Sequence, residues 1–153
     1  MGCDIHPYME FKINGEWVFI GPVEGDRNYM LFGMLSGVRG ADEGFFPQYT
    51  YRYPDDATRD MKRLIDDYGV DGHSHTVCTF EKICEWITVK EKDRSITREY
   101  LDQLWKKNKE DEVTYNEVAK KSIFFVEEWL TLMESAMKDG FVEDARVILW
   151  YDN

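Results

Sequence analysis

The chain has 153 residues, enough for one domain with a hydrophobic core. Apolar residues make up 43% of it, including five Trp, nine Tyr and nine Phe, which excludes a disordered tail and argues against a disulfide-dependent miniprotein. The 30 acidic and 19 basic side chains give a formal charge of −11, and the resulting field repels phosphate backbones. We therefore expect a single domain over residues 1–153 without general nucleic-acid binding.

The cysteines and the amino terminus indicate a compartment. Cys3, Cys78 and Cys84 form no C-x-x-C pair, which favours a reducing cytosol with thiols that are free, buried or bound to metal. The start of the chain has neither the basic nor the apolar region of a signal peptide, and no apolar run is long enough to span a bilayer. We therefore expect a cytoplasmic protein without a membrane partner.

The first 20 residues predict a β-hairpin. Residues 3–13 alternate between apolar and polar side chains, and this period of two is typical of a half-buried strand. Pro7 cannot donate to a ladder, so it indicates an edge strand or a bulge. Asn14-Gly15 favours a tight turn, after which residues 17–20 form the return strand.

The rest of the chain predicts helices and one final strand. Asn28 is placed to cap a short helix that Gly37 closes. Further helices are expected to open at Pro54-Asp55-Asp56, at Thr79, at Ser95 and at the capping box Thr114-x-x-Glu117. Residues 71–76 are expected to form a polar loop, and residues 145–151 a buried strand that pairs with the hairpin. This order favours an α+β fold, with a small antiparallel sheet packed against about five helices.

The first polar cluster lies on the expected first strand. Asp4 and His6 are alternate residues, so their side chains are neighbours on one face, with Glu10 further along it. A carboxylate beside an imidazole suits metal ligation or acid–base chemistry. The alternative is an ordinary solvent-exposed face.

The second cluster is the expected loop with His73 and His75. Together with His6 and Asp4, these residues could form a mononuclear site for a divalent metal such as zinc. The alternative is that the loop side chains cap the helix that follows. Cys78, close to His75, forms the one pair that would suit a cysteine nucleophile.

The third cluster consists of Arg27-Asn28-Tyr29 and Arg39, which flank turns or helix ends. Arginine binds phosphate or carboxylate through two parallel hydrogen bonds, and a helix start adds N–H donors. An aromatic ring such as Tyr29 or Phe45 could stack on a base. The alternative is that both arginines pair with the abundant acidic side chains.

Several short motifs also resemble a family of short uncharacterised phage and prophage proteins. They are Met1-Gly2-Cys3-Asp4-Ile5-His6, Arg27-Asn28-Tyr29-x-Leu31-Phe32, Gly37-Val38-Arg39, Pro54-Asp55-Asp56, Asp71-Gly72-His73-Ser74-His75 and Leu149-Trp150-Tyr151-Asp152-Asn153. Residues 88–113 depart from the pattern. The resemblance implies a phage origin and no particular activity. It does favour a common site, because the shared motifs contain Asp4, His6, Arg27, Asn28, Arg39, His73 and His75.

These observations lead to three functional hypotheses. The first is a phage accessory protein in the host cytosol that binds a small anionic, nucleotide-derived ligand through Asp4, His6, Arg27, Asn28, Tyr29, Arg39, His73 and His75, and so sequesters a host immune signal. The second is a metal-dependent hydrolase or phosphodiesterase with Glu10 as general base. The third is an acidic protein that binds and inhibits a host enzyme. Whether the protein is an enzyme stays open, and an edge strand could support a homo-oligomer.

Overall fold

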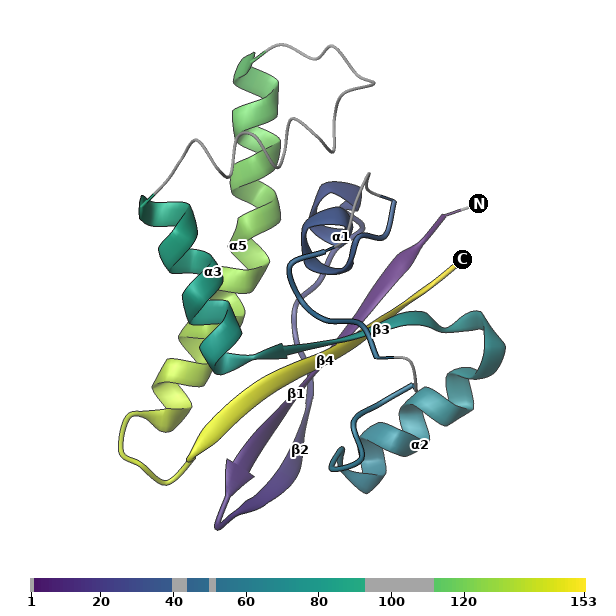
Figure 1. Ribbon diagram of the computed structural model, residues 1–153, viewed down its shortest axis with the longest axis vertical. Coiled ribbons are helices and arrows are strands. Elements are labelled where there is room, and N and C mark those ends of the chain that lie inside the picture. The colour runs from purple at the N-terminus through teal and green to yellow at the C-terminus, as the bar shows by residue number, and fades with distance from the viewer. Residues whose placement is uncertain (1, 40–43, 50–51, 93–111) are drawn as a thin grey trace.

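The computed structural model describes residues 2–39, 44–49, 52–92 and 112–153. The elements, in chain order, are β1 (Asp4–Ile13), β2 (Glu16–Pro22), α1 (Tyr29–Ser36), α2 (Arg59–Tyr68), the short 3-10 helix η1 (Gly69–Asp71), β3 (His73–Thr79), α3 (Phe80–Lys92), α5 (Glu112–Met137) and β4 (Asp144–Asp152). The strands form one antiparallel sheet in the order β2-β1-β4-β3 (Figure 1). The expected α+β class is therefore confirmed.

The two ends of the chain form the middle of the sheet. β1 and β4 pair along their lengths, from Asp4 opposite Asp152 to Lys12 opposite Asp144. This confirms the expected pairing of the final strand with the hairpin, and it places the termini side by side (Figure 1). The hairpin turn is also confirmed, since Asn14 has a φ of 51° and Gly15 a φ of 77°.

Pro7 lies in a central strand, so the expectation of an edge strand is wrong. The Pro7 carbonyl accepts a hydrogen bond from the Val23 amide, just beyond the end of β2. In an antiparallel pair the N–H and C=O of one residue point to the same side, so the missing donor of Pro7 also faces the region where β2 has ended. The irregularity that the proline suggested occurs nearby, between Met9 and Glu10 in the pairing with β2.

The segment expected to be a polar loop, residues 71–76, instead forms η1 and the start of strand β3. Thr76 to Thr79 pair with β4, and the pairing is irregular between His73 and Thr76. Ser74 has a φ of 53°, a conformation that bends the strand. This irregularity breaks the alternation of buried and exposed residues on which the recognition of a strand depends.

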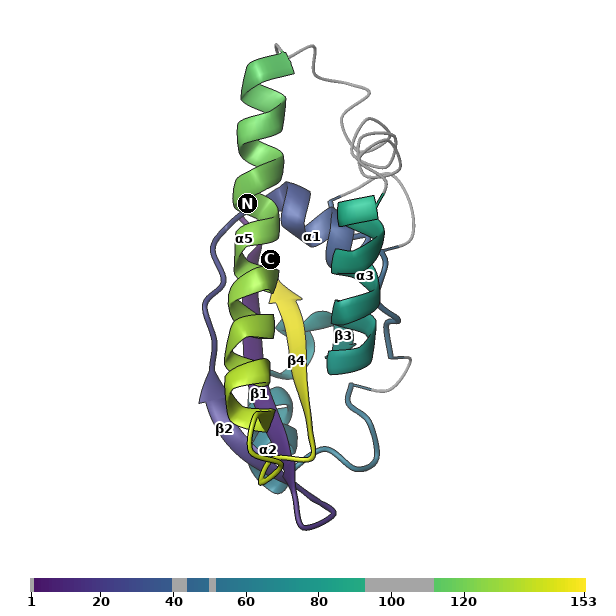
Figure 2. The same cartoon turned by 90° about the vertical axis from the view of Figure 1, so that its left-hand side faces the viewer.

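Helices cover both faces of the sheet. On one face lie α1, α3 and α5, and on the other lies α2 (Figures 1 and 2). The larger core, on the first face, includes Ile5, Met9, Leu35, Ile83, Trp129 and Leu149. The smaller core, under α2, consists of Ala57, Met61, Ile65, Val77, Ile148 and Trp150. The alternation of β1, β3 and β4 divides their side chains between these two cores.

The helices differ from the expectation in number and bounds. The described residues contain four α-helices, not about five, and the helix expected from Ser95 lies outside them. α2 begins at Arg59 after the capping residue Thr58, because Pro54–Asp56 form a separate turn. α5 begins at Glu112, before the expected capping box. The cap at Asn28 is confirmed, since its Oδ1 atom accepts a hydrogen bond from Leu31 N at 3.1 Å.

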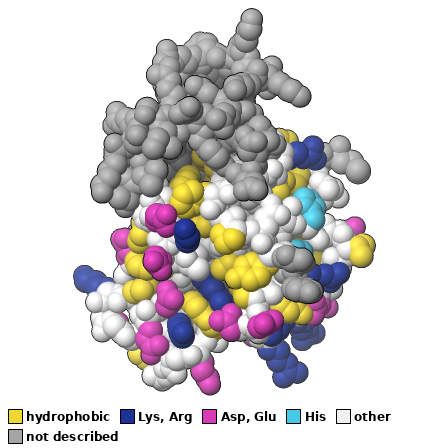
Figure 3. Space-filling view, viewed as in Figure 1, with side chains coloured by type: hydrophobic (Ala, Val, Ile, Leu, Met, Phe, Trp, Pro, Cys, Tyr) yellow, Lys and Arg dark blue, Asp and Glu magenta, His cyan; other side chains and the backbone are white. Residues whose placement is uncertain are grey.

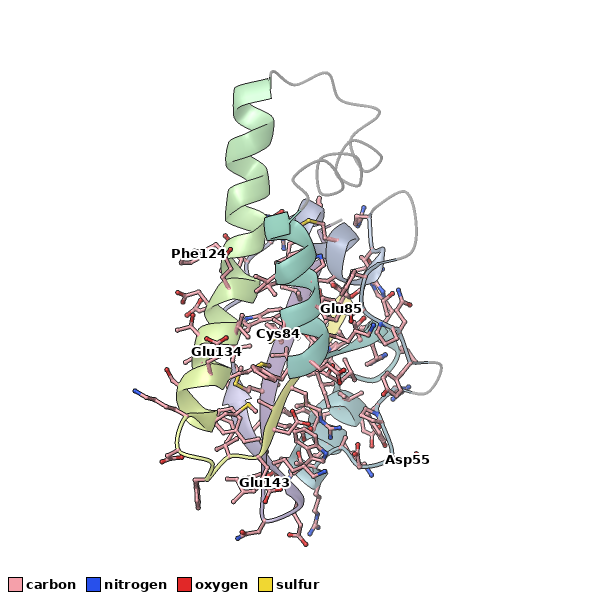
Figure 4. The ribbon with its side chains drawn as sticks, turned by 60° about the vertical axis from the view of Figure 1, so that its left-hand side comes forward. Asp55, Cys84, Glu85, Phe124, Glu134 and Glu143 are labelled. Carbon is pink, nitrogen blue, oxygen red and sulfur yellow. The ribbon has the colours of Figure 1, made fainter. Side chains whose placement is uncertain are left out.

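The two longest helices lie side by side. Cys84 on α3 lies toward α5, and burial and the nearby Glu134 carboxylate raise the pKa of its thiol (Figure 4). Phe124 lies on the side of α5 that is turned away from α3, with 52% of its surface exposed (Figure 4). No helix in the described part of the chain is long and apolar enough to cross a membrane.

Candidate functional site

The polar side chains converge where β1 begins and β4 ends. Asp4 lies opposite Asp152 and His6 lies opposite Trp150, on the face of the sheet that α2 covers. The last residue of α2, Tyr68, reaches this point. We call the residues Asp4, His6, Arg27, Tyr68 and Asp152 the sheet-end cluster.

Three side chains of this cluster are mutually hydrogen-bonded. His6 Nε2 lies 3.1 Å from Asp152 Oδ2 and 2.8 Å from the Tyr68 hydroxyl, which itself donates to Asp152 Oδ2 at 2.9 Å. The other carboxylate oxygen, Oδ1, accepts a hydrogen bond from the Asp4 amide at 3.0 Å. Because a carboxylate only accepts, the His6 contact is favourable when Nε2 carries the proton. The second ring nitrogen, Nδ1, is then the basic one.

The electrostatic effects in this group oppose one another. Burial raises the pKa of Asp152, but the hydrogen bonds from the Asp4 amide, His6 and Tyr68 outweigh it, so the pKa is lowered. For Tyr68, burial and the hydrogen bond to Asp152 raise the pKa to about 12. The carboxylate is therefore charged and the phenol neutral at ordinary pH.

Arg27 and Asp4 form a two-point ion pair at the surface. The guanidinium donates from Nε to Asp4 Oδ1 at 2.7 Å and from Nη2 to Oδ2 at 2.8 Å. Its side chain is 53% exposed and that of Asp4 is 48% exposed. The hydrogen bond from Arg27 lowers the pKa of Asp4. Gly2 leaves room for this ion pair because it has no side chain; a Cβ atom there would lie 2.6 Å from Arg27 Nη1.

The other residues of the third sequence cluster lie beside β1. The Arg39 guanidinium lies 5.3 Å from the centre of the Tyr29 ring, a cation–π distance. The Tyr29 hydroxyl accepts a long hydrogen bond of 3.4 Å from the amide of Cys3, and 41% of the tyrosine is exposed. The Asn28 side chain caps α1, and this hydrogen bond has a structural role.

The two mid-chain histidines point to opposite faces of the sheet. His75 stacks on the Trp150 ring at 6.4 Å, and His6 stacks on the same ring at 5.7 Å. His73 instead stacks on Tyr151 at 6.2 Å, and successive residues of a strand face opposite sides. The three imidazoles therefore do not face one cavity. Burial, with smaller effects from Arg52 and His73, lowers the pKa of His75 to about 4.

The structure does not assemble the expected metal site from His6, His73, His75 and Asp4. The described residues contain no group of three or more His, Cys, Asp or Glu side chains that could hold an ion. Two further expectations also lack support. Glu10 is fully buried in an ion pair with Arg146, so it is not placed to act as a general base. Cys78 is fully buried against the larger core, and burial raises the pKa of its thiol.

Three buried nitrogen atoms near this end of the sheet lack a hydrogen-bond partner. Within the described part of the chain these are Nε2 of His73, Nε2 of His75 and Nε1 of Trp150. Buried polar atoms of this kind are commonly satisfied by ordered water. Figure 3 shows histidine surface on the right-hand side of the molecule, with a basic side chain above it, whereas acidic side chains concentrate at the lower left.

Sequence reasoning missed two residues of the cluster. Tyr68 fits the apolar stripe of α2, and the sequence pattern assigns it to the core. Asp152 is at the end of the final strand, where a polar residue is unremarkable. The signal that could have found Asp152 is the register, because aligning the ends of the first and last strands places it opposite Asp4.

Comparison with known proteins adds no relative: no family model, no curated protein and no solved structure matches this chain. The geometry is therefore the basis for assigning chemistry. In the sheet-end cluster the Asp4 carboxylate holds the Arg27 guanidinium. Next to this pair, the Asp152 carboxylate holds the imidazole of His6 and the phenol of Tyr68. Such a group can bind an anion and can accept a proton.

Proposed function

We propose that this protein binds a small anionic, nucleotide-derived ligand at the sheet-end cluster. The observation that supports the proposal best is the presentation of Arg27, whose guanidinium is held in a fixed orientation by two hydrogen bonds while half of its side chain faces solvent. A guanidinium held in this way has the planar geometry that phosphate and carboxylate groups recognise.

A ligand would bind by replacing Asp4 as the hydrogen-bond partner of Arg27. An ion pair exposed to this degree contributes little to stability, so the Asp4 carboxylate is displaced at little cost. A phosphate group can then take the same two hydrogen bonds from Arg27. The nearby His6 and Tyr68 offer polar atoms to a sugar hydroxyl. The half-exposed ring of Tyr29 offers a surface on which a base can stack.

Calorimetric titration with a panel of phosphate-bearing nucleotides tests the proposal. The panel contains ADP-ribose, a cyclic mononucleotide, a cyclic dinucleotide and an uncharged nucleoside. We expect binding of at least one phosphate-bearing member and none of the nucleoside. Arg27→Gln should weaken that binding by about tenfold or more, since it removes a two-point charged contact with the phosphate.

A matched control separates the site from the overall charge. Arg63→Gln makes the same change of charge on α2, where the Arg63 side chain is 81% exposed and paired only loosely with Asp67 at 3.8 Å. This variant should bind like the original chain. If none of the panel binds, or if both arginine variants lose affinity equally, a specific anion site at Arg27 is ruled out.

The biological part of the proposal rests on the resemblance of the sequence motifs to phage and prophage proteins. A phage accessory protein in the host cytosol that captures a nucleotide signal would act by lowering its free concentration. The expected result is that the purified protein, added in excess, removes the identified ligand from an assay of the host effector that senses it. Full activity of the effector under those conditions would contradict the sequestering role.

A further inference from the structure

We infer that His6 acts as the general base in the hydrolysis of a phosphoanhydride bond, in a nucleotide that Arg27 holds. This inference rests on the proposed function, because the substrate is the ligand that binds at the sheet-end cluster. It goes beyond binding in assigning a reaction, a substrate class and the group that accepts the proton.

The His6 ring is fixed from two elements. Asp152 on β4 and Tyr68 on α2 both contact its Nε2 atom, at 3.1 and 2.8 Å. The Asp152 carboxylate is fixed in turn by the Asp4 amide, at 3.0 Å. This arrangement keeps the proton on Nε2 and leaves the lone pair on Nδ1, which is the orientation in which a carboxylate prepares a histidine to act as a base. The His6 side chain is 22% exposed, so solvent reaches the ring.

The charged and titratable groups around His6 come from β4, β1, α2 and the segment before α1. Asp152 contacts the ring, and Asp4 on the same strand interacts with it electrostatically. Tyr68 is neutral because its pKa is raised to about 12. Arg27 is neutralised by its ion pair with Asp4 in the absence of ligand. Of these groups, Asp152 and Tyr68 contact the ring directly.

The same groups restrict the leaving group. A phosphodiester or glycosidic bond to a sugar oxygen leaves a strongly basic alkoxide, which requires a general acid. Tyr68 is a poor acid, since its hydroxyl already donates to Asp152 and its pKa is raised. In a phosphoanhydride the leaving group is a phosphate, which departs as a stable anion. The described residues of this site supply one base and no strong acid, which fits a phosphoanhydride best.

The proposed step conserves atoms and charge. A water molecule attacks one phosphorus atom of the anhydride while its proton passes to His6 Nδ1. A bond forms between the water oxygen and phosphorus, and the bond from phosphorus to the bridging oxygen breaks, with its electron pair leaving on the second phosphate. His6 then releases the proton to solvent. With ADP-ribose the two products are AMP and ribose 5-phosphate.

The experiment follows ADP-ribose by phosphorus NMR with the full-length protein in the presence of EDTA. The expected result is conversion to the two monophosphates, with label from ¹⁸O-labelled water found in one product phosphate for each bond broken. A cyclic mononucleotide, which lacks an anhydride, should stay intact in the same assay. Hydrolysis of the cyclic mononucleotide would show that the assigned substrate class is wrong.

Variants test the roles of the individual side chains. His6→Gln should lower turnover at least about 100-fold, the usual contribution of a general base, while still binding a methylene-bridged analogue that cannot be hydrolysed. Asp152→Asn keeps the shape of the positioning residue and should lower turnover while leaving the binding of the analogue unchanged, because the imidazole loses the acceptor that orients it. Arg63→Gln is the control and should be fully active. Circular dichroism of each variant verifies that it is folded.

The outcomes distinguish this inference from the proposed function. If the protein binds ADP-ribose and leaves it intact, the base assignment fails and the binding function stands. If His6→Gln or Asp152→Asn folds, binds the analogue and turns over ADP-ribose at the original rate, the role of His6 as a base is disproved. If no phosphate-bearing nucleotide binds, both proposals fail.

Discussion

Glu10 on β1 and Arg146 on β4 lie directly opposite each other and form an ion pair that is almost fully buried, with 0% and 6% of their side chains exposed. Both side chains also have further partners for their polar groups. Arg146 also donates to Asp56 Oδ1 at 2.8 Å and lies 3.9 Å from the Trp17 ring, while Glu10 accepts a hydrogen bond from the Thr58 amide at 2.9 Å. The pair thus ties the start of α2 to the middle of the sheet.

Breaking this pair from one side should be severe. Arg146→Met leaves the Glu10 carboxylate buried without its charged partner, so we expect a loss of about 3–5 kcal/mol in the free energy of unfolding. Urea denaturation followed by circular dichroism measures it. Replacing both residues with apolar ones of similar size should recover much of the loss, and Arg63→Met, at an exposed pair, should cost under about 1 kcal/mol. Equal costs for the two single variants would contradict the buried role of Arg146.

The cap of α2 provides a smaller and more local test. Thr58 Oγ1 accepts a hydrogen bond from the Met61 amide at 3.2 Å. Thr58→Ala removes this acceptor and should reduce the free energy of unfolding by about 1 kcal/mol, whereas Thr58→Ser keeps the acceptor and should retain most of the stability. Thermal unfolding of the three proteins makes the comparison. An alanine variant as stable as the serine variant would show that the side chain does not cap the helix.

A close backbone approach requires glycine at position 44. A Cβ atom added there would overlap the backbone of Ser36 at the end of α1. The neighbouring hydrogen bonds, from the amides of Phe45 and Phe46 to α1 carbonyls at 2.9 and 3.0 Å, hold the loop in this position. Gly44→Ala should therefore be clearly destabilising in a thermal unfolding experiment.

Gly140→Ala is the control for that variant. Gly140 has a φ of 82° but nothing within 4 Å of an added Cβ, so alanine there has only the conformational cost of about 1–2 kcal/mol. The melting temperature should fall further for Gly44→Ala than for Gly140→Ala. The reverse order would mean that the loop can move away from Ser36.

His75 should make the protein less stable in mild acid. Its pKa is lowered from 6.5 to about 4 in the folded state, chiefly by burial, so below pH 6.5 the unfolded chain binds the proton first. Stability is then lost as the pH falls from 6.5 toward 4, by about 2 kcal/mol between pH 7 and pH 5. Urea denaturation at these two pH values measures the loss. His75→Leu should flatten the dependence over this range, and an unchanged slope would show that His75 does not cause it.

The sequence patterns predicted the parts of the fold that depend on local chemistry. The alternation over residues 3–13, the Asn14-Gly15 turn and the cap at Asn28 all appear in the structure, because each is determined by residues close in the chain. β3 was missed because the irregular pairing after His73 interrupts the alternation. The buried partner of Glu10 could not be deduced either, since Arg146 is 136 residues away.

The candidate site was predicted only in part, for the same reason. Asp4 and His6 were placed on one face of a strand, and Arg27 was expected to bind an anion or an acidic side chain; its partner is Asp4. Tyr68 and Asp152 join them only through the register between the first and last strands and the end of α2. His73 does not join the site. It stacks on Tyr151, whereas His75 stacks on Trp150, and these two neighbouring residues of β4 face opposite sides of the sheet.

The pairing of β1 with β4 has a consequence for biosynthesis. β4 follows every other element of the fold in sequence, yet it lies between β1 and β3. During translation the hairpin and β3 are synthesised before the strand that joins them, so β1 lacks one of its two neighbouring strands until β4 has been made. The four-stranded sheet therefore cannot form before β4 has been synthesised, and until then the apolar side chains that pack on β4 are exposed to aggregation and to chaperones.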